Sequence, residues 1–161
     1  MGSVKVIYGS STGETENAAR QIAAMFGVEP INVADAKTDD FKADLLILGS
    51  STWGLGELQD DWLGGIALLE QSDLAGCKVA VFGLGDQEGF SDTFCDAMAI
   101  LAEKAVANGA TLVGQTPTDG YRHTGSLADQ GGMFCGLALD DTNEPDRTAD
   151  RIIDWAELLK C

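Results

Sequence analysis

The chain alternates short apolar runs with segments of helical periodicity from one end to the other. The apolar runs predict strands at residues 4–8, 30–33, 44–49, 77–82, 110–113 and 134–139. Apolar residues recur at helical spacing in residues 14–26, 62–71, 93–108 and 148–159. Strands that alternate with helices predict βαβ units, a parallel sheet and helices on both of its faces. We therefore expect an α/β fold in a single domain that spans residues 1–161.

The charge of the chain limits its partners. Lys and Arg number 10 and Asp and Glu number 26, which gives a formal net charge of −16 and a pI near 4.1. Such a charge repels nucleic acid phosphates and anionic membrane surfaces, so we expect no nucleic acid partner. No apolar run approaches the ~20 residues of a membrane span, and we expect no membrane insertion. Partner proteins with basic surfaces fit this charge better than nucleic acids or anionic membranes do.

The cysteines do not form a metal-binding pattern. Cys77, Cys95, Cys135 and Cys161 include no CxxC pair, and His123 is the one histidine of the sequence. We therefore expect no metal site. Reduced thiols, together with the absence of a leader-like N-terminal segment, predict a cytoplasmic protein.

Three polar, Gly-rich segments each follow a predicted strand. They come after residues 4–8, 44–49 and 77–82. The carboxyl ends of parallel strands share one edge of a sheet, and ligands of such sheets bind at that edge. The three segments are therefore expected to meet there.

The first of these loops carries the hydroxyls of Ser10, Ser11, Thr12 and Thr15 at the start of a predicted helix. Hydroxyls and backbone N–H groups at a helix N-terminus form a cradle for phosphate. The loop contains no Lys or Arg and lacks the GxxxxGK[ST] pattern of nucleoside triphosphatases. A neutral cradle fits a bound monophosphate, although Ser and Thr also serve as ordinary helix caps.

The other two loops each carry an aromatic residue. Trp53 stands between Thr52 and Gly54 in the second loop, and Phe90 ends the third. The third has the spacing GxGxxxG, which differs from the dinucleotide pattern GxGxxG. Two aromatic side chains from separate loops would enclose a flat ring. The alternatives are a Trp53 packed on the domain surface and a Phe90 that caps the core. Together, the loops fit a flat, aromatic, singly phosphorylated ligand, and FMN fits better than ATP or NAD.

The same three loops closely resemble those of the flavodoxins. Residues 10–15 resemble the family's T/S-x-T-G-x-T phosphate motif, residues 52–59 its second flavin loop, and residues 85–90 its third. The resemblance implies a three-layer, doubly wound, five-stranded parallel sheet of order 2-1-3-4-5. Residues 119–133 are similar to the insertion of long-chain flavodoxins, which splits the last strand. Tyr121 and His123, inside this segment, are expected in an exposed loop without chemistry.

The resemblance also implies a function. A protein of this family is a low-potential electron carrier and not an enzyme; it holds FMN non-covalently and cycles mainly between neutral semiquinone and hydroquinone. We expect no catalytic residue. The expected partners are basic-surfaced redox proteins, namely flavodoxin/ferredoxin reductases and electron acceptors, and the expected state is a monomer. The expected FMN contacts are Ser10, Ser11, Thr12, Gly13, Glu14, Thr15, Ser51, Thr52, Trp53, Gly54, Leu55, Gly56, Leu84, Gly85, Asp86, Phe90 and Thr93.

Two positions depart from the family pattern, and one glycine has a predicted role. Many members have Tyr where this chain has Phe90, and Thr142 falls where the family often has an acidic residue near the ribityl chain. We therefore assign no ribityl contact near Asp140. Gly54 tolerates positive φ, so we expect its peptide to turn its carbonyl toward flavin N5–H upon reduction.

Two other protein classes share this topology. An NAD(P)H-dependent FMN quinone reductase would need room for nicotinamide beside the flavin, where Trp53 and Phe90 are expected to lie. A phosphorelay receiver domain would need acidic residues after the first strand and an Asp at the end of the third. This chain has Gly9-Ser10 and Gly49-Ser50 at those places, which argues strongly against that class.

Overall fold

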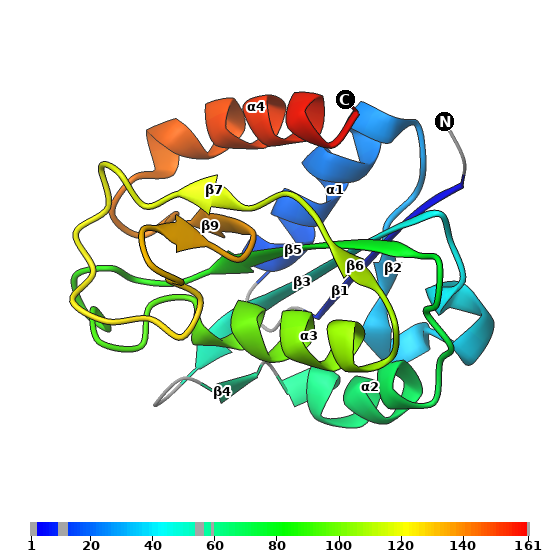
Figure 1. Ribbon diagram of the computed structural model, residues 1–161. Helices are drawn as coiled ribbons and strands as arrows, with labels where there is room; N and C mark the ends of the chain where they lie inside the picture. The colour runs from blue at the N-terminus through cyan, green and yellow to red at the C-terminus, as the bar shows by residue number, and fades with distance from the viewer. Residues whose placement is uncertain (1–2, 10–12, 54–56, 59, 161) are drawn as a thin grey trace.

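Parallel strands pair at the centre of the molecule (Figure 1). The computed structural model describes residues 3–9, 13–53, 57–58 and 60–160. The order across the sheet is β2 (Ile31–Asn32), β1 (Val4–Gly9), β3 (Leu45–Trp53), β5 (Lys78–Leu84) and β6 (Thr111–Leu112). In chain order this is 2-1-3-4-5, so the predicted topology is confirmed.

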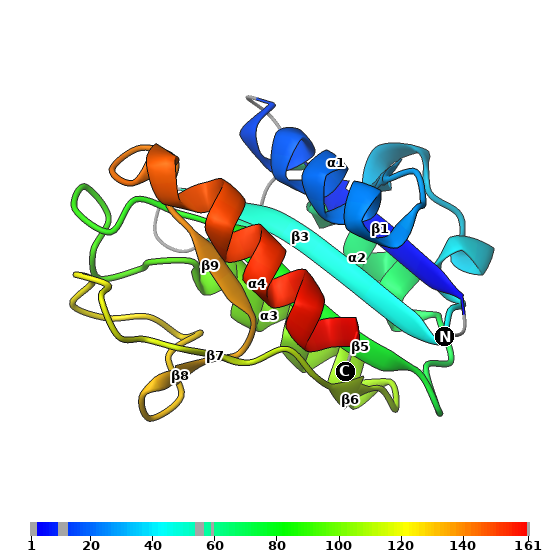
Figure 2. The ribbon, with the colours of Figure 1, turned by 90° about the horizontal axis from the view of Figure 1, so that it is seen from above.

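Helices cover both faces of the sheet. Helices α1 (Glu14–Phe26) and α4 (Thr148–Lys160) lie on one face, and α2 (Asp60–Glu70) and α3 (Asp96–Ala107) lie on the other (Figures 1 and 2). Helix α1 has its predicted bounds, because Gly27 takes a left-handed φ of 68° and donates its N–H to the Ala23 and Ala24 carbonyls. No helix of the described ranges combines the length and the apolar character that a membrane span requires.

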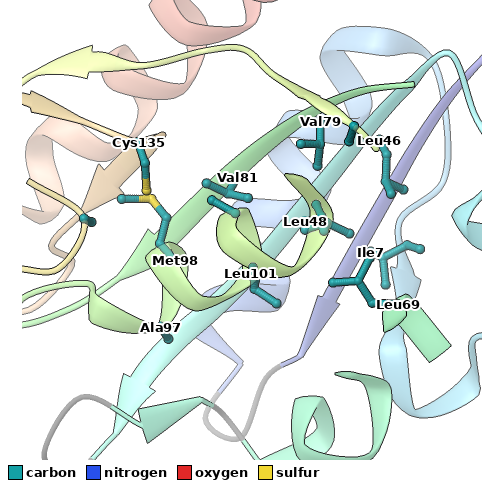
Figure 3. Close-up of a cluster of buried hydrophobic side chains, with 14 of the residues drawn as sticks. Ile7, Leu46, Leu48, Leu69, Val79, Val81, Ala97, Met98, Leu101 and Cys135 are labelled. Carbon is teal, nitrogen blue, oxygen red and sulfur yellow. The ribbon is translucent and has the colours of Figure 1, made fainter. Parts of the chain in front are cut away.

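The strands bury both of their faces, which explains their continuous apolar runs. Alternate strand residues form the layer against α2 and α3: Ile7, Leu46, Leu48, Val79 and Val81 (Figure 3). The intervening residues form the layer against α1 and α4: Val6, Tyr8, Leu45, Ile47, Ala80 and Phe82.

The last row of the sheet is split in two, as predicted. Strand β6 pairs with the beginning of β5, and β9 (Leu137–Leu139) pairs with its end, through Lys78↔Thr111 and Phe82↔Leu137. Between them the chain leaves the sheet, where β7 (Thr116–Pro117) and β8 (Met133–Phe134) form an antiparallel pair. The single strand expected at residues 134–139 is therefore two strands. At the bend, a Cβ on Gly136 would lie 1.9 Å from the Val81 carbonyl oxygen.

Several boundaries differ from those predicted. Strand β3 runs to Trp53 instead of residue 49, because β4 (Glu57–Leu58) folds back and pairs with its end. Helix α3 begins at Asp96 instead of residue 93, because Cys95 has a left-handed φ of 54°. The remaining elements are short 3-10 helices: η1 (Val33–Asp35), η2 (Thr38–Phe41) and η3 (Pro145–Arg147).

Candidate functional site

The three polar loops begin side by side at one edge of the sheet. In the register of the parallel strands, Gly9 of β1 lies beside Ser50 of β3, and Ser51 lies beside Leu84 of β5. Figure 1 shows the β5–α3 loop at the side of the molecule that faces away from both termini. The expected convergence of the loops is therefore confirmed by the strand ends.

The first loop leads into α1. Ser10, Ser11 and Thr12 lie outside the described residues. The described part resumes at Gly13, the N-cap residue of α1, whose φ of 91° is left-handed and which has no side chain with which to cap the helix. The first turn of α1 thus offers backbone N–H groups at the sheet edge, which is a suitable arrangement for an anion.

The first turn of α1 carries two acidic residues, one exposed and one paired, and the buried Thr15. Glu14 is exposed to solvent. Glu16 pairs with Arg20 at 2.5 Å and hydrogen-bonds Tyr8, whose pKa is raised first by burial and then by Glu16. Thr15 lies inward, with 1% of its surface exposed.

The second loop follows β3. Ser51 and Thr52 are half-buried strand residues, and the Trp53 backbone completes the strand. The Thr52 Oγ1 accepts the N–H of Ala97 at 3.0 Å, so this hydroxyl caps α3 from the neighbouring strand. The Trp53 side chain and three further expected contacts, Gly54, Leu55 and Gly56, lie outside the described residues.

The third loop follows β5 and forms a tight turn. Leu84 is buried, and the Gly85 N–H donates to the Leu139 carbonyl at 3.0 Å. The Asp86 Oδ1 accepts the N–H groups of Glu88 at 3.0 Å and Gly89 at 2.7 Å. The turn presents Phe90 at its end, and 54% of the residue's surface is exposed. Phe90 does not cap the core, and an exposed ring at this edge offers a surface for a flat ligand.

Thr93 supplies a further polar atom that fits a bound group. Its Oγ1 is buried and has no hydrogen-bond partner among the described residues. Its backbone N–H donates to the Phe90 carbonyl at 3.2 Å, so Thr93 closes the backbone turn that follows Phe90. Buried polar atoms are almost always paired, so an orphaned hydroxyl in this loop fits a site that receives a polar ligand.

The sequence reasoning missed the side chains that support the third loop from behind. Asp140, which directly follows β9, is fully buried and accepts the Gln87 N–H at 3.1 Å. The Gln87 Nε2 donates to Glu144 at 2.8 Å, and the Asn143 Nδ2 donates to Asp86 at 2.7 Å. The available signal was the position of Asp140, a carboxylate right after a buried strand at the same edge.

Charge is concentrated around this loop. Hydrogen bonds from the Gly89 N–H and the Asn143 amide hold the pKa of Asp86 below its ordinary value. Glu88 is exposed and pairs with Arg122 at 2.9 Å. Across the described ranges, no group of three His, Cys, Asp or Glu side chains is placed to hold a metal ion.

The inserted segment is packed, and the expectation of an exposed loop at Tyr121 and His123 is wrong. The His123 ring stacks on Phe94 with centroids 5.5 Å apart, and 7% of its side chain is exposed. Its Nε2 lies 3.0 Å from an Asp129 carboxylate oxygen, a hydrogen bond that lowers the pKa of Asp129. The Tyr121 hydroxyl donates to the Ala138 carbonyl at 2.5 Å. The insertion thus packs onto the loop that enters α3.

Comparisons with known proteins agree with this geometry. The family model described as Flavodoxin matches residues 6–155. The chain is 43% identical over 165 residues to a flavodoxin of Picosynechococcus sp., covering 99% of this chain and 97% of that protein. It is 44% identical to a flavodoxin of Synechococcus elongatus with the same coverage of both chains. The solved structure of Fusobacterium nucleatum flavodoxin bound to flavin mononucleotide superposes with a TM-score of 0.94 at 31% identity, covering 99% of this chain and 98% of that one. This chain belongs to the flavodoxin family.

Proposed function

We propose that this protein is a low-potential electron carrier that holds FMN non-covalently and passes electrons between redox partner proteins. The observation that carries the proposal is the edge where β1, β3 and β5 end together, with the exposed Phe90 and the orphaned Thr93 hydroxyl in the loop that follows β5. The near-identical fold of an FMN-bound flavodoxin supports it. We take residues 1–161 as one FMN-binding domain.

The first loop is proposed to hold the FMN phosphate. The glycine at the N-cap of α1 and its left-handed φ support this role, because helix N-termini bind phosphate through their N–H groups. Ser10, Ser11, Thr12 and Thr15 would add hydroxyl donors, with Glu14 beside them. The exposed position of the Glu14 side chain leaves room for a dianion.

The second and third loops are proposed to hold the flavin ring. Trp53 and Phe90 would cover its faces and exclude water from it, and Thr93 would donate its hydroxyl. The remaining proposed contacts come from the same two loops: Ser51, Thr52, Gly54, Leu55, Gly56, Leu84, Gly85 and Asp86. The Gly85 N–H already donates to Leu139, and Leu84 is buried. These two residues would therefore shape the backbone around the flavin ring and would not donate hydrogen bonds to it.

The chemistry comes from the bound flavin, which accepts one or two electrons. The protein sets the potential of those electrons through what surrounds the ring. An ionised Asp86 and the net charge of −16 both oppose further negative charge, so they lower the potential of the second electron. The apolar aromatic cover acts in the same direction by removing water.

We further propose that the partners are reductases and acceptors with basic surfaces, that the carrier is a monomer, and that it is cytoplasmic. The exposed Glu88 and the net charge support electrostatic steering. The buried free thiols Cys77, Cys95 and Cys135 support a reducing compartment. Steering predicts that the rate of reduction by a partner falls as salt is raised, and a salt-independent rate would contradict it.

The visible spectrum during stepwise dithionite reduction tests the proposal. We expect the bands of bound oxidised flavin, then a separate half-reduced form with long-wavelength absorbance, then the bleached form. A protein that remains colourless after addition of FMN would contradict the proposal. Direct reduction by NADPH without a half-reduced form would instead support an FMN-dependent reductase.

A further inference from the structure

The turn at residues 86–90 is built around a single carboxylate oxygen. The Asp86 Oδ1 accepts the N–H groups of Glu88 and Gly89, and the Asp86 carbonyl accepts the Phe90 N–H at 2.9 Å. A Cβ on Gly89 would lie 2.5 Å from the Asp86 Oδ2, so the chain passes directly over the carboxylate. The orientation of Asp86 therefore fixes the place where Phe90 leaves the turn.

Asn143 holds that carboxylate from outside the loop. Its Nδ2 donates to the Asp86 Oδ1 at 2.7 Å and to the Asp140 Oδ2 at 2.8 Å. Its backbone N–H donates to the Asp140 Oδ1 at 3.0 Å. The neutral amide of Asn143 thus bridges the carboxylates of Asp86 and Asp140, which lie 54 positions apart in the sequence. A carboxamide supplies two N–H donors without adding charge, which neither Asp nor an apolar residue can do.

The adjacent Gln87 has an anchorage of its own. Its side chain is fully buried, its Nε2 donates to Glu144, and its Oε1 accepts the Arg122 N–H at 2.6 Å. Glu144 is held in turn by Arg151 at 2.9 Å. Loss of the Asn143 side chain would therefore release Asp86 and the turn that carries Phe90, while these bonds still hold the base of the loop.

We propose that Asn143 is a positioning residue for the flavin: its amide bridge between Asp86 and Asp140 sets the Asp86–Phe90 turn for the ring before FMN binds. The inference rests on the proposed FMN-carrier function. A turn that is already set loses less conformational freedom when the ligand binds, so the bridge strengthens FMN binding. It also fixes how close the Asp86 charge comes to the ring, and thereby the potential.

The experiment compares Asn143→Ala and Asn143→Asp with Asn108→Ala as a matched control. The Asn108 Nδ2 donates to the Leu69 carbonyl at 2.6 Å, at the C-terminal end of α3. The dissociation constant for FMN, the two one-electron midpoint potentials, and urea unfolding of the apoprotein are measured for each variant. Asn143→Asp keeps the side-chain size and serves as the test if the Ala variant does not fold.

We expect Asn143→Ala to raise the FMN dissociation constant about tenfold, because the Asp86–Phe90 turn must then be ordered when FMN binds. Asn143→Asp should weaken binding at least as much, and should lower the potential of the second electron because it adds a negative charge. Asn108→Ala should leave the constant within about twofold and both potentials unchanged. Unchanged FMN affinity and potentials in both Asn143 variants would overturn the inference. Wild-type protein that does not bind FMN would instead overturn the proposed function.

Discussion

Helices α1 and α3 start at the same edge of the sheet, and they start in different ways. Each is entered through a left-handed residue, Gly13 with φ 91° and Cys95 with φ 54°. The N-cap residue of α1 is a glycine, which supplies no capping side chain. The start of α3 is held from elsewhere: the Ala97 N–H bonds Thr52 at 3.0 Å, and Asp96 accepts the Leu127 N–H at 2.8 Å.

The difference separates the two halves of the candidate site. The proposed phosphate side draws on one contiguous stretch of sequence, residues 10–15, through backbone N–H groups and hydroxyls, so it can be encoded locally. The proposed ring side includes the β5–α3 loop and the start of α3, which Thr52, Asp140 and Asn143 support from other elements. We expect the ring side to be sensitive to substitutions far away in the sequence, and the phosphate side to be sensitive to substitutions within residues 10–15.

The largest effect is expected from Asp140→Ala. The substitution removes a fully buried carboxylate and leaves the N–H groups of Gln87 and Asn143 without their acceptor. The free energy of unfolding of the apoprotein should fall by about 3 kcal/mol in urea titrations. Asp39→Ala is the control, because 88% of the Asp39 side chain is exposed. This substitution should change the free energy of unfolding little. A loss below about 1 kcal/mol for Asp140→Ala would show that the distant support is dispensable.

Gly13→Ala tests the backbone of the phosphate side. A left-handed φ of 91° is unfavourable for a residue with a Cβ, so the apoprotein should lose about 1–2 kcal/mol of unfolding free energy. The control is Gly64→Ala within α2, where a Cβ would meet no atom within 4 Å. That change should stabilise by about 0.5–1 kcal/mol, because Ala favours a helix interior. Equal effects of the two substitutions would contradict the account.

Thr52→Val tests the cap that β3 supplies to α3. Valine keeps the shape of the side chain but lacks the hydroxyl that accepts the Ala97 N–H. The free energy of unfolding should therefore fall by about 1 kcal/mol. Thr111→Val, at an exposed position of β6, should stay within about 0.5 kcal/mol of wild type. If both variants match the wild type, Thr52 does not cap α3 in solution.

The smallest effect is expected from Glu16→Gln in the first turn of α1. Its ion pair with Arg20 is at the surface, where 68% of the Arg20 side chain is exposed. Such pairs contribute about 0.5 kcal/mol or less, and salt screens them further. Thermal unfolding at low and high salt measures the change. A loss above about 1 kcal/mol would mean that side chains hold the start of α1 as they hold α3.

Much of this architecture was predictable from the sequence. The apolar runs predicted the parallel sheet, and Gly27 predicted the end of α1, because these signals are local. The three loops were predictable because each directly follows a buried strand. The side chains behind the third loop were not predictable, since Gln87 and Asp140 meet only after the chain has returned through α3 and the insertion. The left-handed backbone of Cys95 and the packing of His123 were not predictable for the same reason. Tertiary contacts determine both the conformation of Cys95 and the position of His123.

Amide hydrogen exchange of the FMN-free protein tests the central claim most directly. The account predicts that the N–H groups of Gln87, Gly89 and Ala97 exchange slowly without FMN, because side-chain oxygens already hold them. The N–H groups of residues 14–16 should exchange faster, and FMN should then slow them the most. Rapid exchange at Gln87 and Gly89 that slows only when FMN is added would contradict the claim that the ring side is set beforehand.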